Sequence, residues 1–150
     1  MLINGWRIYF LKRLFGQQRR DLREEVQRLK AKLPREDYVR HPTVKLYAAI
    51  MRSIRESIPA DPLASRFALT GSLKQYSRVK KMGIPSRYRL FFKVFQIAEQ
   101  KSIFILWLGY PCKEGDKKDC YRGFKKMVER GDFPQSLNEL LQESEKTLQS

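Results

Sequence analysis

Residues 76–95 limit what this chain can fold into, because apolar and cationic side chains alternate along the second half of the stretch. Side chains alternate across a strand with a period of two, so the alternation predicts a strand with one apolar and one cationic face. The apolar face would carry Tyr88, Leu90, Phe92 and Val94. The opposite face would carry Arg87, Arg89 and Lys93, with Phe91 and Phe95 between them. A shorter strand precedes it, and the Gly-Ile-Pro-Ser sequence at 83–86 predicts a short turn between the two.

In a hairpin of these two strands, basic side chains would converge on one surface patch. Its predicted members are Arg78, Lys80, Arg87 and Arg89. Between Asp61 and Glu99 the chain has no acidic residue but has eight lysines or arginines. A surface that serves only solubility usually mixes both signs of charge. The one-signed patch therefore predicts binding of an anion, and a polyphosphate chain is the first candidate.

The charge of the whole chain favours the same classes of partner. The net charge is +15 and the calculated pI is about 10.1, which suits nucleic acid, an anionic membrane surface or an acidic protein. The length of 150 residues fits a single domain, 1–150. Its last part, about 134–150, carries Glu139, Glu143 and Glu145 and is expected to form an acidic helical tail.

The sequence predicts neither a metal site nor any other cofactor. Zinc needs about four ligands, and the only histidine, His41, is distant in sequence from the two cysteines, Cys112 and Cys120. We expect a structural role for His41 at the start of a helix. The longest apolar run, 103–108, is too short to span a membrane, so we expect a cytoplasmic protein without membrane contact.

Hydrophobic spacing predicts the remaining elements and their order. Helices are expected at 17–32, at 41–57 and from 117 or 118 to 130, and a capping box at 136–139 opens a last helix. Strands are expected at 6–10 and at 102–108, with Trp6 and Trp107 in the core. The order β-α-α-β-β-β-α predicts a small α+β domain with a mainly antiparallel sheet and a helical hairpin on one face.

The chain lacks the common catalytic motifs, so any enzyme activity would depend on arginine, lysine and tyrosine. No Gly-rich phosphate loop, nucleophile elbow or carboxylate pair accompanies the basic patch. This set of residues suits RNA cleavage by attack of the 2′-OH on the adjacent phosphate. Arginine and lysine would stabilise the charge that develops on the phosphorane, and a lysine or tyrosine would move a proton.

Several motifs occur in one order along the chain. They are Asn4-Gly5-Trp6, Arg78-Val79-Lys80, Arg87-Tyr88-Arg89-Leu90-Phe91-Phe92 and Tyr121-x-x-Phe124-x-Lys126-Met127. In these motifs the chain resembles the YhaV family of type II toxins, within the wider RelE/ParE superfamily, from about Asn4 to Pro134. The resemblance implies a RelE-like fold and a bacterial endoribonuclease that cleaves mRNA in association with the ribosome and inhibits translation and growth. It also implies inhibition by a cognate PrlF-type antitoxin, whose complex with the toxin is expected to bind operator DNA.

The resemblance also implies positions for the site. The implied catalytic residues are Arg78, Lys80, Arg89 and Tyr121. Further RNA contacts are expected at Arg87, Lys81, Lys93, Lys117, Lys118 and Lys125. A basic residue that precedes the last helix in the superfamily pattern has no clean equivalent, and Lys117 or Lys118 is the best substitute. In a structural alternative, Arg89 braces the sheet edge and Tyr121 packs beside Phe124.

The sequence leaves two further questions open. One is the class of function: a ParE-like toxin that binds a protein such as gyrase without cleaving nucleic acid, or a plain nucleic-acid-binding module, would also carry a basic patch. The other is how an antitoxin binds. We expect an acidic antitoxin segment to lie across the patch of Arg78, Lys80, Arg87 and Arg89, and the alternative is that the antitoxin docks on the helical hairpin through 17–32.

Overall fold

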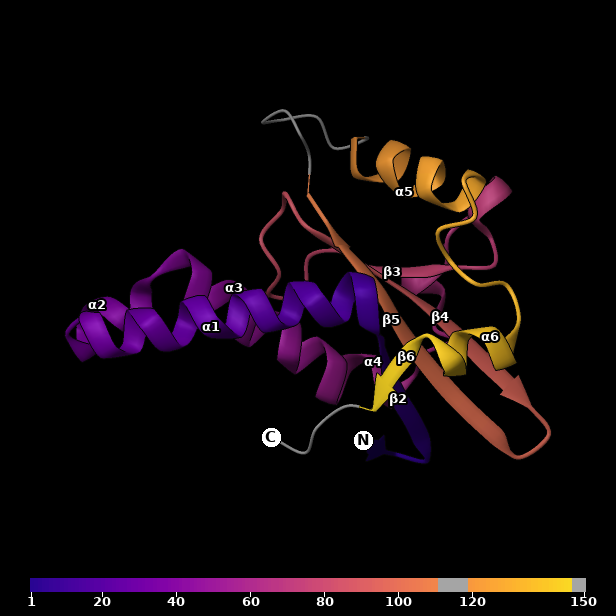
Figure 1. The fold of residues 1–150 in the computed structure, drawn as a ribbon, viewed down its shortest axis with the longest axis horizontal. Helices are drawn as coiled ribbons and strands as arrows, with labels where there is room; N and C mark the ends of the chain where they lie inside the picture. Colours follow the sequence, from indigo (N-terminus) through magenta and orange to yellow (C-terminus); the bar gives the residue numbers. More distant parts are fainter. Residues whose placement is uncertain (111–118, 147–150) are drawn as a thin grey trace.

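The computed structural model describes residues 1–110 and 119–146, which form an α+β fold around a mixed sheet (Figure 1). The strands are β1 (Leu2–Ile3), β2 (Trp6–Leu11), β3 (Ser77–Val79), β4 (Arg89–Ile97), β5 (Gln100–Gly109) and β6 (Ser144–Lys146). The helices are α1 (Gln17–Lys32), α2 (Arg35–Arg40), α3 (Pro42–Arg52), α4 (Ile58–Ala60), α5 (Asp119–Glu129) and α6 (Leu137–Gln142). Short π-helical segments occupy Lys12–Gly16 and Ser53–Ser57.

The sheet has the order β1-β2-β5-β4-β3, and β6 also pairs with β2. The β2–β5 ladder is parallel, and the other pairings are antiparallel. The strand predicted at 102–108 is confirmed as β5, which lies between β2 and β4, with Ile103 to Leu106 fully buried. An apolar run of this length is typical of a strand covered on both faces.

The alternation predicted for the second hairpin strand is confirmed, but the predicted cationic face is covered, because Arg89 and Lys93 are buried. Leu90, Phe92 and Val94 face the core beneath the N-terminal helices, whereas Phe91 and Phe95 face the core on the other side of the sheet. The predicted short turn is wrong, because β3 ends at Val79 and β4 begins only at Arg89. Residues 80–88 form a loop whose Ile84 is buried in the helical-side core. Pro85 cannot donate to a strand ladder, which also works against pairing here.

Asn4-Gly5 forms a turn, and it joins β2 to a strand that the sequence did not indicate. Asn4 (φ 53°) and Gly5 (φ 83°) are both left-handed, as a two-residue type I′ hairpin requires. The amide of Asn4 donates to the carbonyl of Pro59 at 2.9 Å, which ties this hairpin to α4. The paired strand β1 has only two residues, too few for a visible pattern.

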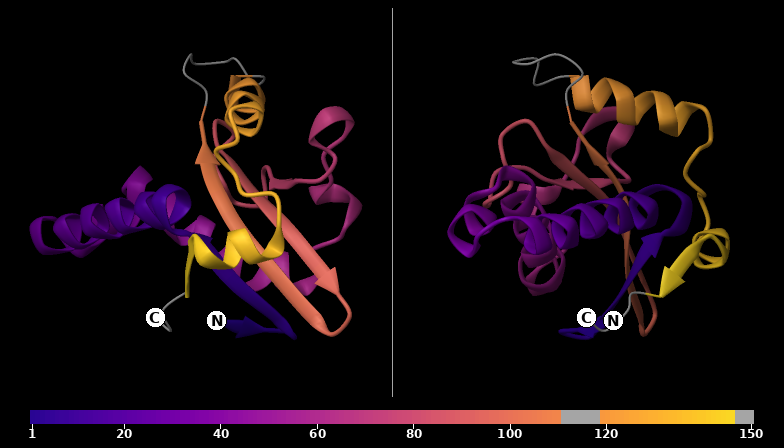
Figure 2. Two further views of the ribbon diagram at one scale, coloured as in Figure 1. Left: turned by 45° about the vertical axis from the view of Figure 1, so that its right-hand side comes forward. Right: turned by 60° about the vertical axis from the view of Figure 1, so that its left-hand side comes forward.

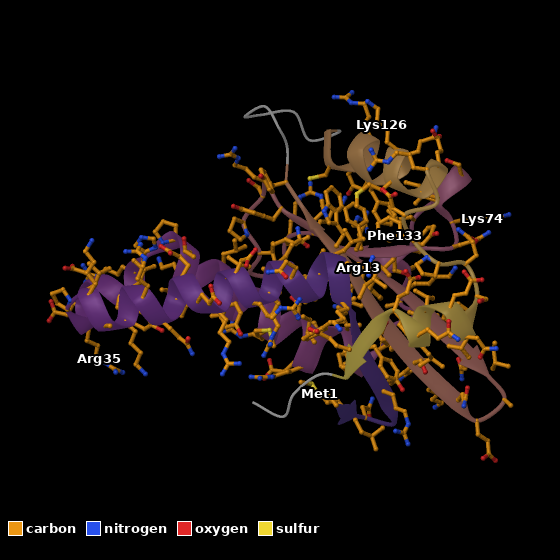
Figure 3. All side chains as sticks on the ribbon, in the orientation of Figure 1. Met1, Arg13, Arg35, Lys74, Lys126 and Phe133 are labelled. Atoms are coloured by element: carbon orange, nitrogen blue, oxygen red, sulfur yellow. The ribbon has the colours of Figure 1, made fainter. Side chains whose placement is uncertain are left out.

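The N-terminal helices cover one face of the sheet and project beyond it, with Arg35 near the far end of the projection (Figures 2 and 3). His41 caps α3, because its Nδ1 accepts from the backbone N–H of Thr43 at 3.1 Å, so its structural role is confirmed. The single helix predicted for 41–57 is wrong in detail. α3 passes into a π-helical turn and then α4, because Pro59 lacks an N–H and crowds the carbonyl four residues earlier.

The opposite face of the sheet is covered by α5 and α6. The ring of Phe124 in α5 stacks on Phe91 in β4 with 4.0 Å between centroids, and Phe133 packs against it from the following loop. Gly131 ends the helix with φ 78°, as expected. The predicted start of this helix, at Lys117 or Lys118, lies outside the described residues.

The acidic tail contains the predicted helix and an additional strand. Ser136 Oγ accepts from the backbone N–H of Glu139 at 3.2 Å, which confirms the cap of α6. β6 then pairs with β2, and Glu145 forms a 2.6 Å ion pair with Arg20 of α1. The strand has only three residues, and polar residues at 144–146 gave no strand signal.

We predict that Phe124→Ala destabilises the fold, because Phe124 is fully buried and its ring packs against Phe91, Phe133 and Tyr76. Large-to-small changes of this kind cost about 3–5 kcal/mol. Chemical denaturation measures the loss of unfolding free energy. Lys125→Ala, on the exposed side of the same helix, is the control and should change stability by less than about 0.5 kcal/mol. Equal stabilities of the two variants would show that α5 does not depend on this contact.

Candidate functional site

Three predicted site residues meet where α5 crosses β3 and β4. Arg78 lies in the edge strand β3, Arg89 begins β4, and Tyr121 lies near the start of α5. Arg78 pairs with Phe91, and Val79 pairs with Leu90, so the register places Arg78 and Arg89 at the same end of the sheet. We call Arg78, Arg89 and Tyr121 the arginine–tyrosine cluster.

The cluster is joined at one atom, the phenol oxygen of Tyr121. Arg78 Nε donates to it at 3.0 Å, and Arg89 Nε donates to it at 3.1 Å. The guanidinium of Arg89 also lies 5.9 Å from the centre of the Tyr121 ring. A phenol oxygen that accepts two hydrogen bonds still has its own hydrogen to donate. The arrangement therefore holds two cations and one O–H donor in a fixed relation.

Backbone carbonyls hold the two guanidinium groups in place. Arg78 Nη1 donates to the carbonyl of Arg66 at 2.8 Å. Arg89 Nη1 donates to the carbonyls of Ser86 and Tyr88, both at 2.8 Å. These acceptors and the Tyr121 hydroxyl are neutral oxygens, so these bonds orient the arginines without neutralising their charge. The carbonyls of Arg66 and Ser86 were not predicted as part of the site, since a backbone acceptor leaves no signal in the sequence.

The cluster combines burial and access to solvent. Arg89 is buried, with 7% of its surface exposed, whereas Arg78 and Tyr121 are half-buried. Phe91 packs edge-on against the Tyr121 ring at 5.8 Å between centroids, which fixes the ring from below. Charge–dipole interactions are stronger in such a partly desolvated place than at an open surface. The geometry therefore suits recognition of a phosphate group at the mouth of the cluster.

The loop at 80–88 presents the other predicted cations of this region. Lys80, Lys81 and Arg87 are exposed. The loop turns through left-handed residues, with Lys81 at φ 61°, Met82 at φ 58° and Gly83 at φ 88°. The N–H of Ile84 donates to the carbonyl of Lys81 at 3.1 Å and closes this turn. Left-handed backbone at a non-glycine residue costs free energy and often occurs at functional sites.

The remaining predicted RNA contacts have different positions. Lys125 is exposed on α5, and the labelled Lys126 beside it points away from the sheet (Figure 3). Lys117 and Lys118 lie outside the described residues. Lys93 does not lie on the surface, since only 7% of it is exposed. Its Nζ lies 5.0 Å from the centre of the Tyr76 ring and 5.1 Å from that of Phe95.

The expected exposure of Lys93 is therefore wrong, and the reason is packing by Tyr76, which directly precedes the neighbouring strand β3. Lys93 lies on the predicted face of the strand, but Tyr76 packs into the core on this face of the sheet. Burial lowers the pKa of Lys93 and raises the pKa of Tyr76, because it disfavours the charged form of each group. The strand pattern predicted the face of Lys93 but gave no sign of what covers that face.

Residues 1–110 and 119–146 contain no group of three or more histidine, cysteine or acidic side chains able to hold a metal ion. Within the same residues, no helix has both the length and the apolar character needed to cross a membrane.

Comparisons with known proteins agree on one family. Residues 9–145 match the family model Toxin_YhaV, described as a toxin with endonuclease activity, of a toxin-antitoxin system. The chain is 35% identical to "Toxin YhaV" of Escherichia coli O6:H1, covering 97% of this chain and 96% of that protein. It has the same identity and coverage with "Ribonuclease toxin YhaV" of Escherichia coli strain K12. No solved structure was found to match the chain.

We predict that Lys93→Met changes how the stability of the protein depends on pH. The pKa of Lys93 is lower in the folded protein than its ordinary value of 10.5. At a pH between the folded and the unfolded pKa, Lys93 therefore takes up a proton when the protein unfolds. The wild type should therefore gain stability relative to Lys93→Met as pH rises toward about 10.5. Denaturation curves of both proteins at several alkaline pH values measure this difference. Lys125→Met, at an exposed position, is the control that isolates the effect of burial. If the stabilities of all three proteins change with pH in parallel, the prediction is wrong.

Proposed function

The chain belongs to the YhaV family of toxins of toxin–antitoxin systems, and from this premise we propose that it cleaves mRNA at the arginine–tyrosine cluster. The observation that carries the proposal is the convergence of Arg78 Nε and Arg89 Nε on the Tyr121 oxygen. Two oriented cations beside an O–H donor match what phosphodiester cleavage needs: charge stabilisation and proton transfer. The family's endonuclease activity favours this function over a ParE-like toxin that only binds a protein target.

In this proposal, the arginines bind the scissile phosphate of the RNA. The bonds described above use Nε and Nη1 of each arginine, and a guanidinium has five N–H donors in all. The remaining donors of the planar fork fit the non-bridging phosphate oxygens. Because carbonyls already fix both groups, little reorganisation is required as negative charge builds up on the phosphorane.

The proposed reaction is an attack by the 2′-oxygen on the adjacent phosphorus. The 2′-oxygen bonds to phosphorus, its proton passes to solvent, and the bond from phosphorus to the 5′-oxygen breaks. Tyr121 donates its hydroxyl proton to the departing 5′-oxygen and regains a proton from water. The products are a 2′,3′-cyclic phosphate and a 5′-hydroxyl, and the chain's own cations suffice to stabilise the charge.

The exposed cations around the cluster would extend the RNA contact. Lys80 lies next to β3 in the loop at 80–88 and is the third cation we assign to the site, as a phosphate contact beside Arg78. Neighbouring phosphates would be contacted by Arg87 and Lys81 in the loop and by Lys125 on α5. Contacts of Lys117 and Lys118 with the same RNA backbone stay predictions. A lysine is a suitable point charge for such contacts. Lys93 has no place in this track, because it is buried.

The wider biology follows from the same premise. We propose a cytoplasmic toxin with a RelE-like fold that inhibits translation and growth, acts on mRNA in association with the ribosome, and is neutralised by a PrlF-type antitoxin. The complex of toxin and antitoxin is expected to bind operator DNA. Family membership supports a cognate antitoxin, and the net charge of +15 fits both nucleic acid and an acidic protein partner.

We predict that Tyr121→Phe and Arg89→Lys both lose growth inhibition while the protein remains folded. Tyr121→Phe removes the proton donor, and loss of a general acid lowers the rate by about 10²–10⁴-fold. Arg89→Lys keeps a charge but loses the planar fork that reaches Tyr121 and the two carbonyls, and should lower the rate by about 10²–10³-fold. RNA cleavage by purified protein and growth after induction measure the effects.

Arg7→Ala is the matched control for these variants, because Arg7 is exposed and pairs with the opposite end of β5, at Ser102. Thermal unfolding should confirm that each variant is folded. Wild-type cleavage by Tyr121→Phe would remove Tyr121 from the mechanism, and wild-type cleavage by Arg89→Lys would leave Arg89 as a brace of the sheet.

We also predict that Arg78→Ala and Lys80→Ala each weaken RNA binding and its dependence on salt. Each phosphate contact that is lost should lower the slope of log affinity against log salt by about 0.7–1. Titration of a short RNA at several salt concentrations measures the slope. An unchanged slope in both variants would place the phosphate track elsewhere, with Lys125 and Lys126 as the next residues to test.

A further inference from the structure

A groove runs along the N-terminal helical layer, on different elements from the arginine–tyrosine cluster. It has a volume of about 600 Å³ and lies between α1, α2 and α3 with the π-helical turn that follows α3. Figure 1 shows these helices extending away from the sheet, while α5 lies above the sheet. The residues that line the groove are unused by the function proposed above, so the groove is available to a different partner.

The groove has an apolar floor and a basic rim. Its floor is formed by Val26, Tyr38, Tyr47, Ala48 and Met51. Its rim carries Arg23, Lys30, Arg52 and Arg55, with Glu56 as the one acidic residue among the lining side chains. Tyr47 and Tyr38 are half-buried, and Met51 is buried, so the floor is a packed surface that offers apolar contact area.

This combination fits an amphipathic protein segment better than a nucleic acid. Nucleic-acid sites are much more positively charged and polar than protein interfaces, and an apolar floor would leave a phosphate backbone without partners. Grooves between packed helices bind amphipathic helices, whose apolar side chains occupy the floor. Carboxylates at the edges of such a helix would meet the four cations of the rim, which predicts an acidic partner.

A second groove, of similar volume, lacks the basic rim of the first one. It has a volume of about 520 Å³ and is lined by Leu11, Lys12, Arg13, Leu14, Asp132, Gln142 and Glu143. Its two cations are balanced by two carboxylates, so it has no preference for a partner of one charge.

We propose that the groove between α1, α2 and α3 is the docking site for an acidic amphipathic segment of the cognate antitoxin. A toxin of a toxin–antitoxin system has such a partner, and the groove offers charge complementarity and apolar area together. The antitoxin is held through the helical layer, and the basic patch at Arg78 and Lys80 contributes little to its affinity. The inference rests on family membership and is independent of the cleavage chemistry proposed for the cluster.

The test measures the affinity of purified toxin variants for the purified product of the adjacent antitoxin gene. Ala48→Trp fills the groove from an exposed position of α3, and Lys45→Trp, exposed on the same helix but outside the groove, is its control. Arg23→Glu with Arg52→Glu reverses the charge of two rim residues, and Lys12→Glu with Lys74→Glu makes the same change of charge at exposed positions away from this groove. Each groove variant should bind the antitoxin at least about 100-fold more weakly, as loss of an interface hot spot does.

The controls should stay within about threefold of wild type, since distant exposed charges are screened by salt. The groove variants should keep wild-type cleavage of RNA, and in cells they should be toxins that the antitoxin no longer neutralises. Unchanged antitoxin affinity in both groove variants would overturn the proposal. Loss of antitoxin affinity in Arg78→Ala or Lys80→Ala, but not in the groove variants, would also overturn it. So would groove variants that bind the antitoxin normally but differ from wild type in RNA affinity or in the oligomeric state of the free toxin. Because binding is measured without cleavage, these results are independent of whether the cluster is the active site.

Discussion

The stack of Phe91 on Phe124 is the contact on which the arrangement of the site depends. It joins β4 to α5 with 4.0 Å between ring centroids, in a part of the core where both rings are fully buried. Arg89 lies two residues before Phe91 on the same strand face, and Tyr121 lies one helical turn before Phe124. The packing that anchors the helix therefore also brings the hydroxyl of Tyr121 to the guanidinium groups. The proposed chemistry and the stability of the fold therefore depend on one strand face and one helix face.

Sequence periodicity predicted most of this arrangement but not all of it. The alternation in β4 and the helical spacing of α1 and α5 are local patterns set by burial, so they were read correctly. The two-residue strand β1, the strand β6 and the π-helical turn before α4 depend on pairing or strain that short stretches do not display. Arg78, Arg89 and Tyr121 were proposed from the family resemblance, and the structure brings their side chains together. The burial of Lys93 was not predicted, because strand alternation gives the face on which a side chain lies but not the rings that cover it, here Tyr76 and Phe95.

The proposed functions of the molecule are divided between two surfaces. One is the arginine–tyrosine cluster with the exposed cations at 80–88, where polar and cationic groups are fixed by backbone carbonyls. The other is the groove in the helical layer, where apolar side chains lie within a basic rim. The first has the donors that a phosphate needs, and the second has the apolar area that a protein segment needs. Placing them on different elements would allow the inhibitor and the substrate to be recognised by different chemistry, although both are anionic.

The most direct test of the cleavage account is the chemical nature of the RNA ends that the purified protein produces. A defined RNA is digested in the presence of EDTA, and its products are analysed by mass spectrometry. Attack by the 2′-oxygen at a site of arginine and tyrosine predicts 2′,3′-cyclic phosphate and 5′-hydroxyl ends, formed at the same rate with and without the chelator. Ends with a 3′-hydroxyl and a 5′-phosphate, or loss of cleavage in EDTA, would contradict the account.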